Sequence, residues 1–174
     1  MVLDGHVQPI LSLDFSPNGY QLVTGSADDT IRVWDMRASK ALCTIPAHTS
    51  NVADVRFYMN HEMYSSKPGV EVDGLPEGED GDFNMADESG DSTPSKPGID
   101  TEEWRLRSGM YLASGGYDGF VKLWSADDWN LLRTFPTDSG KVMSVDLSPD
   151  ARLLASGTYM RNFQLFAPEE VLVV

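Results

Sequence analysis

The amino-acid sequence predicts an all-β fold, a partial β-propeller of three four-stranded antiparallel blades with a disordered acidic insertion in the second blade. Short apolar or β-branched runs alternate with turn residues, which is typical of antiparallel strands joined by tight turns. The same series of runs returns after 42 residues, as between Phe15 and Phe57. Four short strands in a period of this length are typical of one propeller blade, so the period predicts the architecture.

Three segments carry the repeat, and the second of them is interrupted. They are residues 12–35, residues 54–57 continued by 111–125, and residues 144–166. Trp124 and Phe166 are again 42 residues apart, whereas 90 residues separate Trp34 from Trp124. The second repeat therefore contains an insertion of 48 residues.

Each repeat supplies its strands in chain order. The expected strands of blade one are residues 10–15, 20–24, 31–34 and 41–45, with turns at Pro17-Asn18-Gly19 and Asp28-Asp29. Those of blade two are residues 52–57, 110–115, 120–124 and 130–135, and those of blade three are 142–147, 152–157, 162–166 and 171–174. Residues 1–57 thus hold blade one and the first strand of blade two, residues 58–108 the insertion, and residues 109–174 the remainder.

The insertion differs from the repeats in composition. Between Met59 and Arg107 there are thirteen acidic residues and four basic ones, together with many Pro and Gly. Because it has few large apolar groups, burial cannot offset the entropy lost on ordering, and we expect disorder. The segment is an acidic arm for a basic partner, a phosphorylation site at Ser92-Thr93-Pro94, or only a tolerated loop extension.

Composition argues against several classes of function. The 174 residues carry a net charge of −14 and their 13 Lys and Arg form no run, which disfavours a general nucleic-acid or membrane binder. Cys43 is the single cysteine, so we expect neither disulfides nor a cysteine-rich metal site. No stretch approaches the roughly 20 apolar residues that span a bilayer, and no signal peptide is recognisable. We therefore expect a soluble intracellular protein.

Short marks recur at the repeat spacing: Gly5-His6 and Ala47-His48 before the repeats, Trp34-Asp35 and Trp124-Ser125 at the end of their third strands. They resemble the Gly-His and Trp-Asp dipeptides of WD40 repeats. The resemblance implies a buried hydrogen-bonded chain in each blade, formed by His6, Thr24, Asp28 and Trp34 in the first and by His48, Ser114, Asp118 and Trp124 in the second. Such a chain is physically reasonable because a buried indole N–H and a buried imidazole need partners.

The third repeat departs from this pattern. Its matching positions hold Asp138, Ser156, Met160 and Phe166, so only the hydroxyl remains. We expect blade three to depend on apolar packing and to be less firmly closed.

The sequence segments between these dipeptides point to one group of WD40 proteins. FSPNGYQLVTGSADDTIRVWDMR, CTIPAH, GGYDGFVKLW and GKVMSVDLS are similar to the carboxy-terminal repeats of the WD-repeat subunits of the U4/U6 small nuclear ribonucleoprotein, which act in pre-mRNA splicing. The resemblance implies a nuclear, non-catalytic scaffold of the U4/U6 or U4/U6.U5 particle. Its partners would be other spliceosomal proteins and, indirectly, small nuclear RNA. The repeat marks alone equally permit a WD40 adaptor in another complex, such as a ubiquitin ligase or a chromatin assembly.

No residue pattern predicts catalysis. His6 and His48 follow small residues and precede Asp and Trp at the repeat spacing, so we interpret them as structural rather than as bases or metal ligands. His61 has no second ligand at metal spacing, and the sequence has neither a nucleophile elbow nor a phosphate-binding loop. We expect no enzyme activity, no cofactor, no metal and no small-molecule substrate.

Candidate partner-binding residues follow from propeller geometry. The turn between the second and third strands of a blade lies at one face near the central channel, which places Tyr117, Tyr159 and Arg161 there. Tyr and Arg are the residue types that protein interfaces favour. The alternative is that all three are solvated turn residues.

Overall fold

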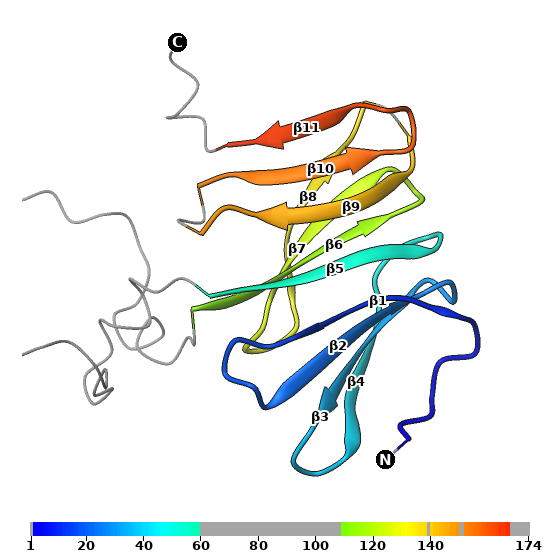
Figure 1. The fold of residues 1–174 in the computed structure, drawn as a ribbon, viewed down its shortest axis with the longest axis vertical. Coiled ribbons are helices and arrows are strands. Elements are labelled where there is room, and N and C mark those ends of the chain that lie inside the picture. The colour runs from blue at the N-terminus through cyan, green and yellow to red at the C-terminus, as the bar shows by residue number, and fades with distance from the viewer. Residues whose placement is uncertain (1, 60–108, 139, 150–151, 168–174) are drawn as a thin grey trace, which may run out of the picture.

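The computed structural model describes residues 2–59, 109–138, 140–149 and 152–167. Within these ranges the chain forms three antiparallel sheets and no helix, stacked one beside the next (Figure 1). The predicted all-β fold of three propeller blades is confirmed. The described part of the chain contains no helix long and apolar enough to cross a membrane.

The strands of each blade pair in chain order. Blade one contains β1 (Ile10–Phe15), β2 (Gln21–Ser26), β3 (Thr30–Asp35) and β4 (Lys40–Pro46). Blade two contains β5 (Val52–Met59), β6 (Met110–Gly116), β7 (Phe120–Ser125) and β8 (Leu131–Pro136). Blade three contains β9 (Val142–Leu147), β10 (Leu154–Thr158) and β11 (Phe163–Phe166). Its predicted fourth strand, residues 171–174, lies outside the described residues, as does nearly all of the acidic insertion.

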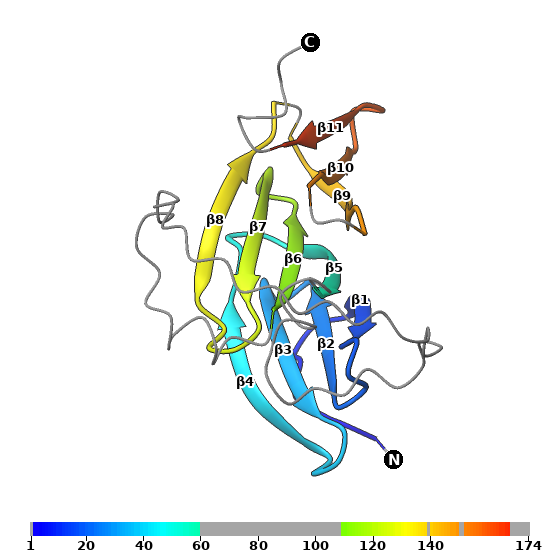
Figure 2. The same ribbon diagram turned by 90° about the vertical axis from the view of Figure 1, so that its left-hand side faces the viewer.

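The blades stack through their first strands. β1 contacts β5, β5 contacts β9, and the three strands lie along one edge of the molecule, with β4 and β8 along the opposite edge (Figure 2). Side chains that are fully or nearly fully buried fill the spaces between the sheets. Val23, Val33, Val55, Leu112 and Trp124 belong to the core between blades one and two, and Ala113, Val121, Val142, Val145 and Leu154 form the core between blades two and three.

Two glycines allow the sheets to approach this closely. A Cβ on Gly25 of β2 would lie 2.8 Å from a methyl of Val52, and a Cβ on Gly115 of β6 would lie 2.6 Å from a methyl of Val142. The two positions are repeat equivalents, 90 residues apart. The repeat therefore specifies the same close contact at both blade interfaces.

Several strand limits differ from the predicted ones, and hydrogen bonding explains two of them. β10 begins at Leu154 rather than at residue 152, because the Ser148 amide donates to the Leu153 carbonyl and closes a turn before the strand. β5 continues to Met59, beyond the expected boundary at 57, because Tyr58 and Met59 still pair with β6. The Tyr58 hydroxyl also donates to the Pro149 carbonyl at 2.9 Å, which ties β5 to the turn of blade three.

Candidate functional site

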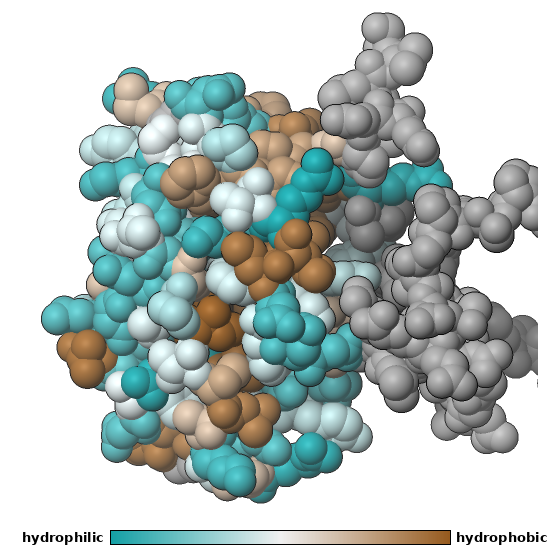
Figure 3. All heavy atoms as spheres, turned by 180° about the vertical axis from the view of Figure 1, so that it is seen from behind, coloured by the Kyte–Doolittle hydropathy of each residue, from teal (hydrophilic) through white to brown (hydrophobic). Residues whose placement is uncertain are grey.

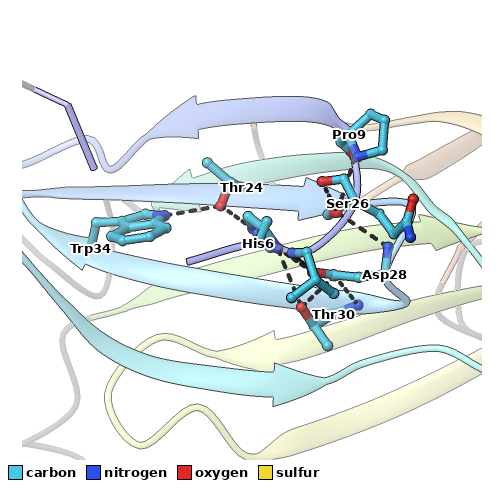
Figure 4. Close-up of polar contacts among 9 residues, drawn as sticks. His6, Pro9, Thr24, Ser26, Asp28, Thr30 and Trp34 are labelled. Atoms are coloured by element: carbon cyan, nitrogen blue, oxygen red, sulfur yellow. Dashed lines mark hydrogen bonds and ion pairs between the residues drawn. The ribbon is translucent and has the colours of Figure 1, made fainter. Parts of the chain in front are cut away.

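The structure brings together all four members of the chain expected in blade one. His6 precedes β1, Thr24 lies on β2, Asp28 lies in the turn after β2, and Trp34 lies on β3 (Figure 4). The Trp34 indole N–H donates to the Thr24 hydroxyl at 2.9 Å, and that hydroxyl lies 2.7 Å from His6 Nε2. His6 Nδ1 lies 2.8 Å from an Asp28 carboxylate oxygen. Blade one is thereby closed from its third strand to the segment before its first.

Blade two contains the same arrangement, with Ser in place of Thr. Trp124 Nε1 donates to the Ser114 hydroxyl at 2.9 Å, Ser114 Oγ lies 2.9 Å from His48 Nε2, and His48 Nδ1 lies 2.9 Å from Asp118. A neutral imidazole with its proton on Nδ1 satisfies every group, since it donates to the carboxylate and accepts from the hydroxyl. The His48 side chain is fully buried.

Electrostatics favour the neutral imidazole and the ionised carboxylates. Desolvation by burial lowers the pKa of His48, although the Asp118 charge opposes this shift. Desolvation alone would raise the pKa of Asp118, but hydrogen bonds from the Thr49 amide and from His48 hold it below its usual value. In blade one desolvation is likewise outweighed by hydrogen bonds from Thr30 and His6, which hold the pKa of Asp28 well below its usual range.

Glycine makes room for the chain in blade two. A Cβ on Gly116 would lie 2.4 Å from His48 Nδ1 and 2.6 Å from an Asp118 oxygen, so no larger residue fits without displacing the pair. Sequence reasoning did not single out Gly116 or Thr30, whose hydroxyl donates to Asp28 at 2.6 Å. The Gly115-Gly116 dipeptide is a sequence signal for the first, and no comparable signal exists for the second.

Blade three lacks the hydrogen-bonded chain, and its remaining hydroxyl has no partner among the described residues. Ser156 is fully buried, and its Oγ makes no hydrogen bond within the described part of the chain. Asp138, at the histidine position, instead accepts a hydrogen bond of 2.9 Å from Gln164 Nε2. Met160, at the aspartate position, is exposed, and Phe166 at the tryptophan position offers no N–H.

Polar groups also bridge neighbouring blades, which sequence reasoning missed. The Ser12 hydroxyl of β1 donates to Asp54 of β5 at 2.6 Å, and Asp54 accepts from the Val145 amide of β9 at 3.1 Å. Asp14 accepts from the Phe57 amide at 2.7 Å. The sequence signal is an acidic residue inside a largely apolar strand, and it does not reveal which amide the carboxylate reaches.

The candidate contact residues lie in neighbouring turns, and Lys141 joins two of them. Tyr117 follows β6, and the Lys141 ammonium lies 4.9 Å from the centre of its ring. The Lys141 carbonyl accepts from the Tyr159 amide at 2.9 Å, and the Tyr159 side chain is exposed. Arg161 is exposed with a φ of 66°, at the left-handed turn position where blade two has Gly119. We call Tyr117, Lys141, Tyr159 and Arg161 the turn patch.

The sheet face of blade one is apolar and exposed. Ile10, Leu13 and Phe15 have exposed fractions of 48%, 53% and 55%. Val52 and Val55, the equivalents of Ile10 and Leu13 in blade two, are fully buried against blade one. Hydrophobic side chains also reach the surface on the face seen in Figure 3, where they lie among polar ones. Blade one therefore presents the surface by which blade two docks on its neighbour.

The described residues offer no constellation for chemistry. They contain no group of three His, Cys, Asp or Glu able to hold a metal ion. Cys43 is half-buried on β4, where desolvation by burial raises the pKa of its thiol and disfavours the reactive thiolate. The histidines of both blades are engaged in the networks above, and each network joins the strands of its own sheet.

Comparison with known proteins identifies the repeat. The profile of the family described as "WD domain, G-beta repeat" matches residues 1–35, 106–125 and 129–160, half of the chain.

Individual relatives carry varied names. Pre-mRNA-processing factor 19 of Oryza sativa subsp. japonica is 28% identical over 94% of this chain and 23% of its own length. COMPASS component SWD3 of Saccharomyces cerevisiae is 29% identical over 75% of this chain and 42% of its own length. The guanine nucleotide-binding protein subunit beta of Oryza sativa subsp. japonica is 25% identical over 94% of this chain and 45% of its own length. The chain thus spans less than half the length of these relatives.

Proposed function

Because this chain belongs to the WD40-repeat family, we propose that it is a protein-binding scaffold without turnover of its own. The exposed apolar face of blade one is the observation that carries the proposal. Its residues Ile10, Leu13 and Phe15 occupy positions that serve in blade two to dock one sheet on another. An exposed apolar surface of this kind needs to be covered, either by a further blade or by a partner protein.

The use of the polar side chains supports the same proposal. His6 and His48 are the residues best suited to acid–base chemistry, and each lies between a hydroxyl and a carboxylate within its own blade. A general base needs access to a substrate proton, which the fully buried His48 lacks. The proposed roles of the two chains are therefore structural.

The turn patch is the proposed contact surface for a partner protein. Tyr117 and Tyr159 supply aromatic area, and Lys141 and Arg161 supply positive charge. The left-handed φ of Arg161 is shared by the equivalent residues Asp29 and Gly119, so the turn of the repeat fixes the position from which the Arg161 side chain leaves the backbone.

Our finer proposal assigns the scaffold to pre-mRNA splicing, as a nuclear subunit of the U4/U6 or U4/U6.U5 small nuclear ribonucleoprotein. The resemblance of SPNGY and TIPAH and the similarity to a pre-mRNA-processing factor support it. The partners would be other spliceosomal proteins, with the small nuclear RNA reached through them. The alternative is an adaptor in another assembly, such as a ubiquitin ligase or a chromatin complex, and the similarity to a COMPASS component favours it.

Affinity purification of the complete protein from nuclear extract, followed by RNA sequencing and mass spectrometry, separates these proposals. Recovery of U4 and U6 RNA with spliceosomal proteins supports the splicing assignment. Recovery of ligase or chromatin subunits without these RNAs contradicts it but leaves the scaffold proposal intact. A matched purification with Tyr159→Ala and Arg161→Ala should lose partners that use the turn patch.

A further inference from the structure

Apolar residues are exposed at both ends of the stack of blades (Figure 1). At the end formed by blade one, Ile10, Leu13 and Phe15 are the equivalents of residues by which blade two docks on blade one. At the end formed by blade three, Phe163 of β11 has an exposed fraction of 72%, whereas its equivalent Ile31 is fully buried between blades one and two. Each end therefore exposes positions that are buried where two blades meet.

A glycine on the outer side of blade three matches the glycines at the two blade junctions. Gly157 of β10 is the repeat equivalent of Gly25 and Gly115, each of which lies against a valine of the next blade. Apart from its chain neighbours, a Cβ on Gly157 would have only Ser144 Cβ within 4 Å among the described residues, at 3.9 Å. In blade one the position of that valine is held by Ile10, which is also β-branched and is exposed.

Polar groups on the first strands also join neighbouring blades. Ser12 Oγ of β1 accepts a hydrogen bond from the Val55 amide of β5 at 3.3 Å, and Asp14 accepts one from the Phe57 amide at 2.7 Å. The junction between blades two and three keeps the first of these contacts, with an aspartate in place of the serine. The donors are backbone amides, so any blade with acceptors at these two positions can hold the first strand of another blade in the same way.

Blade three carries the acceptors of blade one rather than those of blade two. Ser144 and Asp146 of β9 are the repeat equivalents of Ser12 and Asp14, and both are exposed. Blade two has Arg56 at the second position, and a guanidinium offers no acceptor. We call Ser144, Asp146, Gly157 and Phe163 the outer face of blade three. This face repeats the surface of blade one on which blade two docks.

We propose that the outer face of blade three docks on the exposed face of blade one in a second copy of this chain. The Leu13 amide of the second copy donates to Ser144, and its Phe15 amide donates to Asp146. Its apolar side chains cover Phe163. The contact reproduces between two chains the junction that blades one and two form within one chain, and burial of both apolar faces drives it.

Two copies are enough to close the assembly. The contact joins two different faces, so it is heterologous and produces either a closed ring or an open filament. Two copies of three blades bring six blades together, which lies within the four to eight blades of typical propellers, whereas three copies would bring nine. We therefore expect a symmetric dimer in which each copy docks both of its ends on the other.

Size-exclusion chromatography with light scattering on the complete chain tests the proposal, and we expect a dimer. Leu13→Glu and Phe163→Glu each place a carboxylate on one of the two faces, so each variant should dimerise at least tenfold more weakly. Both side chains are exposed, so the circular dichroism spectra should stay those of the folded chain. Leu132→Glu is the matched control. It alters an exposed leucine of blade two, whose neighbours belong to the same chain, and should leave the dimer unchanged.

Mixing the two variants tests which faces meet. The Leu13→Glu chain keeps an unaltered blade three, and the Phe163→Glu chain keeps an unaltered blade one, so a mixture retains one intact junction. Energy transfer between differently labelled chains should show that the mixture associates at least tenfold more tightly than either variant alone. A mixture that associates no better than the single variants overturns the proposal.

Three further results would also overturn it. The first is an unaltered chain that is monomeric. The second is association that appears only after residues 168–174 are deleted or residues 60–107 are replaced by a linker, because those residues would then cover the faces. The third is association that Phe163→Glu leaves unchanged, which would refute this mode of pairing while the proposed scaffold function stands.

Discussion

Two serines at the same repeat position should respond in opposite ways to the same substitution. Ser114 and Ser156 are both fully buried on the second strand of their blades, 42 residues apart. The Ser114 hydroxyl accepts from Trp124 and lies within hydrogen-bond distance of His48, whereas the Ser156 hydroxyl has no partner within the described part of the chain. Their replacement by Ala therefore isolates the contribution of the hydrogen-bonded chain.

Ser114→Ala leaves an indole donor and an imidazole acceptor unsatisfied. Each of these two unsatisfied buried groups costs about 1–3 kcal/mol, so we expect a loss of about 2–6 kcal/mol in the free energy of unfolding. Ser156→Ala removes an unpaired hydroxyl, and stability should stay unchanged or rise by up to about 1 kcal/mol. For a chain of this length, 1 kcal/mol shifts the melting temperature by about 2–4 °C, which calorimetry resolves. Equal losses in the two variants would refute the reasoning, because packing alone would then explain both.

Three further predictions concern the same networks and the insertion. In the full-length protein, Trp34→Ala and Asp118→Asn should each lower the free energy of unfolding by about 1–3 kcal/mol, because each leaves a buried polar group unsatisfied. The lost volume of the indole adds to the effect of Trp34→Ala. An unchanged melting temperature together with lost partner binding would instead give these residues a role in binding. The pKa of His48 is lower in the folded state than in the unfolded state, where it is about 6.5. The contribution of His48 to the free energy of unfolding is therefore complete above a pH of about 6.5 and is lost as the pH falls from there through the folded pKa. Urea titrations at several pH values should show this decline, and the His48→Gln variant should lack it. The contributions of Asp28 and Asp118, whose folded pKa values are also lowered, should persist until pH falls below about 4. Replacing residues 60–107 by a short Gly-Ser linker should leave the melting temperature no lower, and a large drop would show that the insertion packs.

The sequence predicted the fold well because its period is strict. Strand β9 lies at its expected residues, and β1 does as well. The hydrogen-bonded chains of blades one and two could be located because His, Ser or Thr, Asp and Trp recur at one spacing. The sequence period predicts only those strands and side-chain contacts that the repeats have in common.

The features that escaped prediction are those in which repeats differ or meet. The bridge from Ser12 through Asp54 to the Val145 amide depends on which edge groups face each other across blades, and strand patterns carry no such information. The Ser156 hydroxyl, which has no partner in the part of the chain that the structure describes, likewise becomes visible only when the positions of its missing partners are known.

The exposed face of blade one gives the most direct test of the scaffold account. Size-exclusion chromatography with light scattering on this 174-residue chain should show self-association or poor solubility, because large exposed apolar faces associate. Leu13→Glu together with Phe15→Glu should reduce the association, while Arg37→Glu should not. Supplying further blades, to the total of seven that the family resemblance implies, should restore a well-behaved particle. A sharp monomer peak of the unaltered chain, combined with cooperative melting, would contradict the account and show that three blades form a self-sufficient domain.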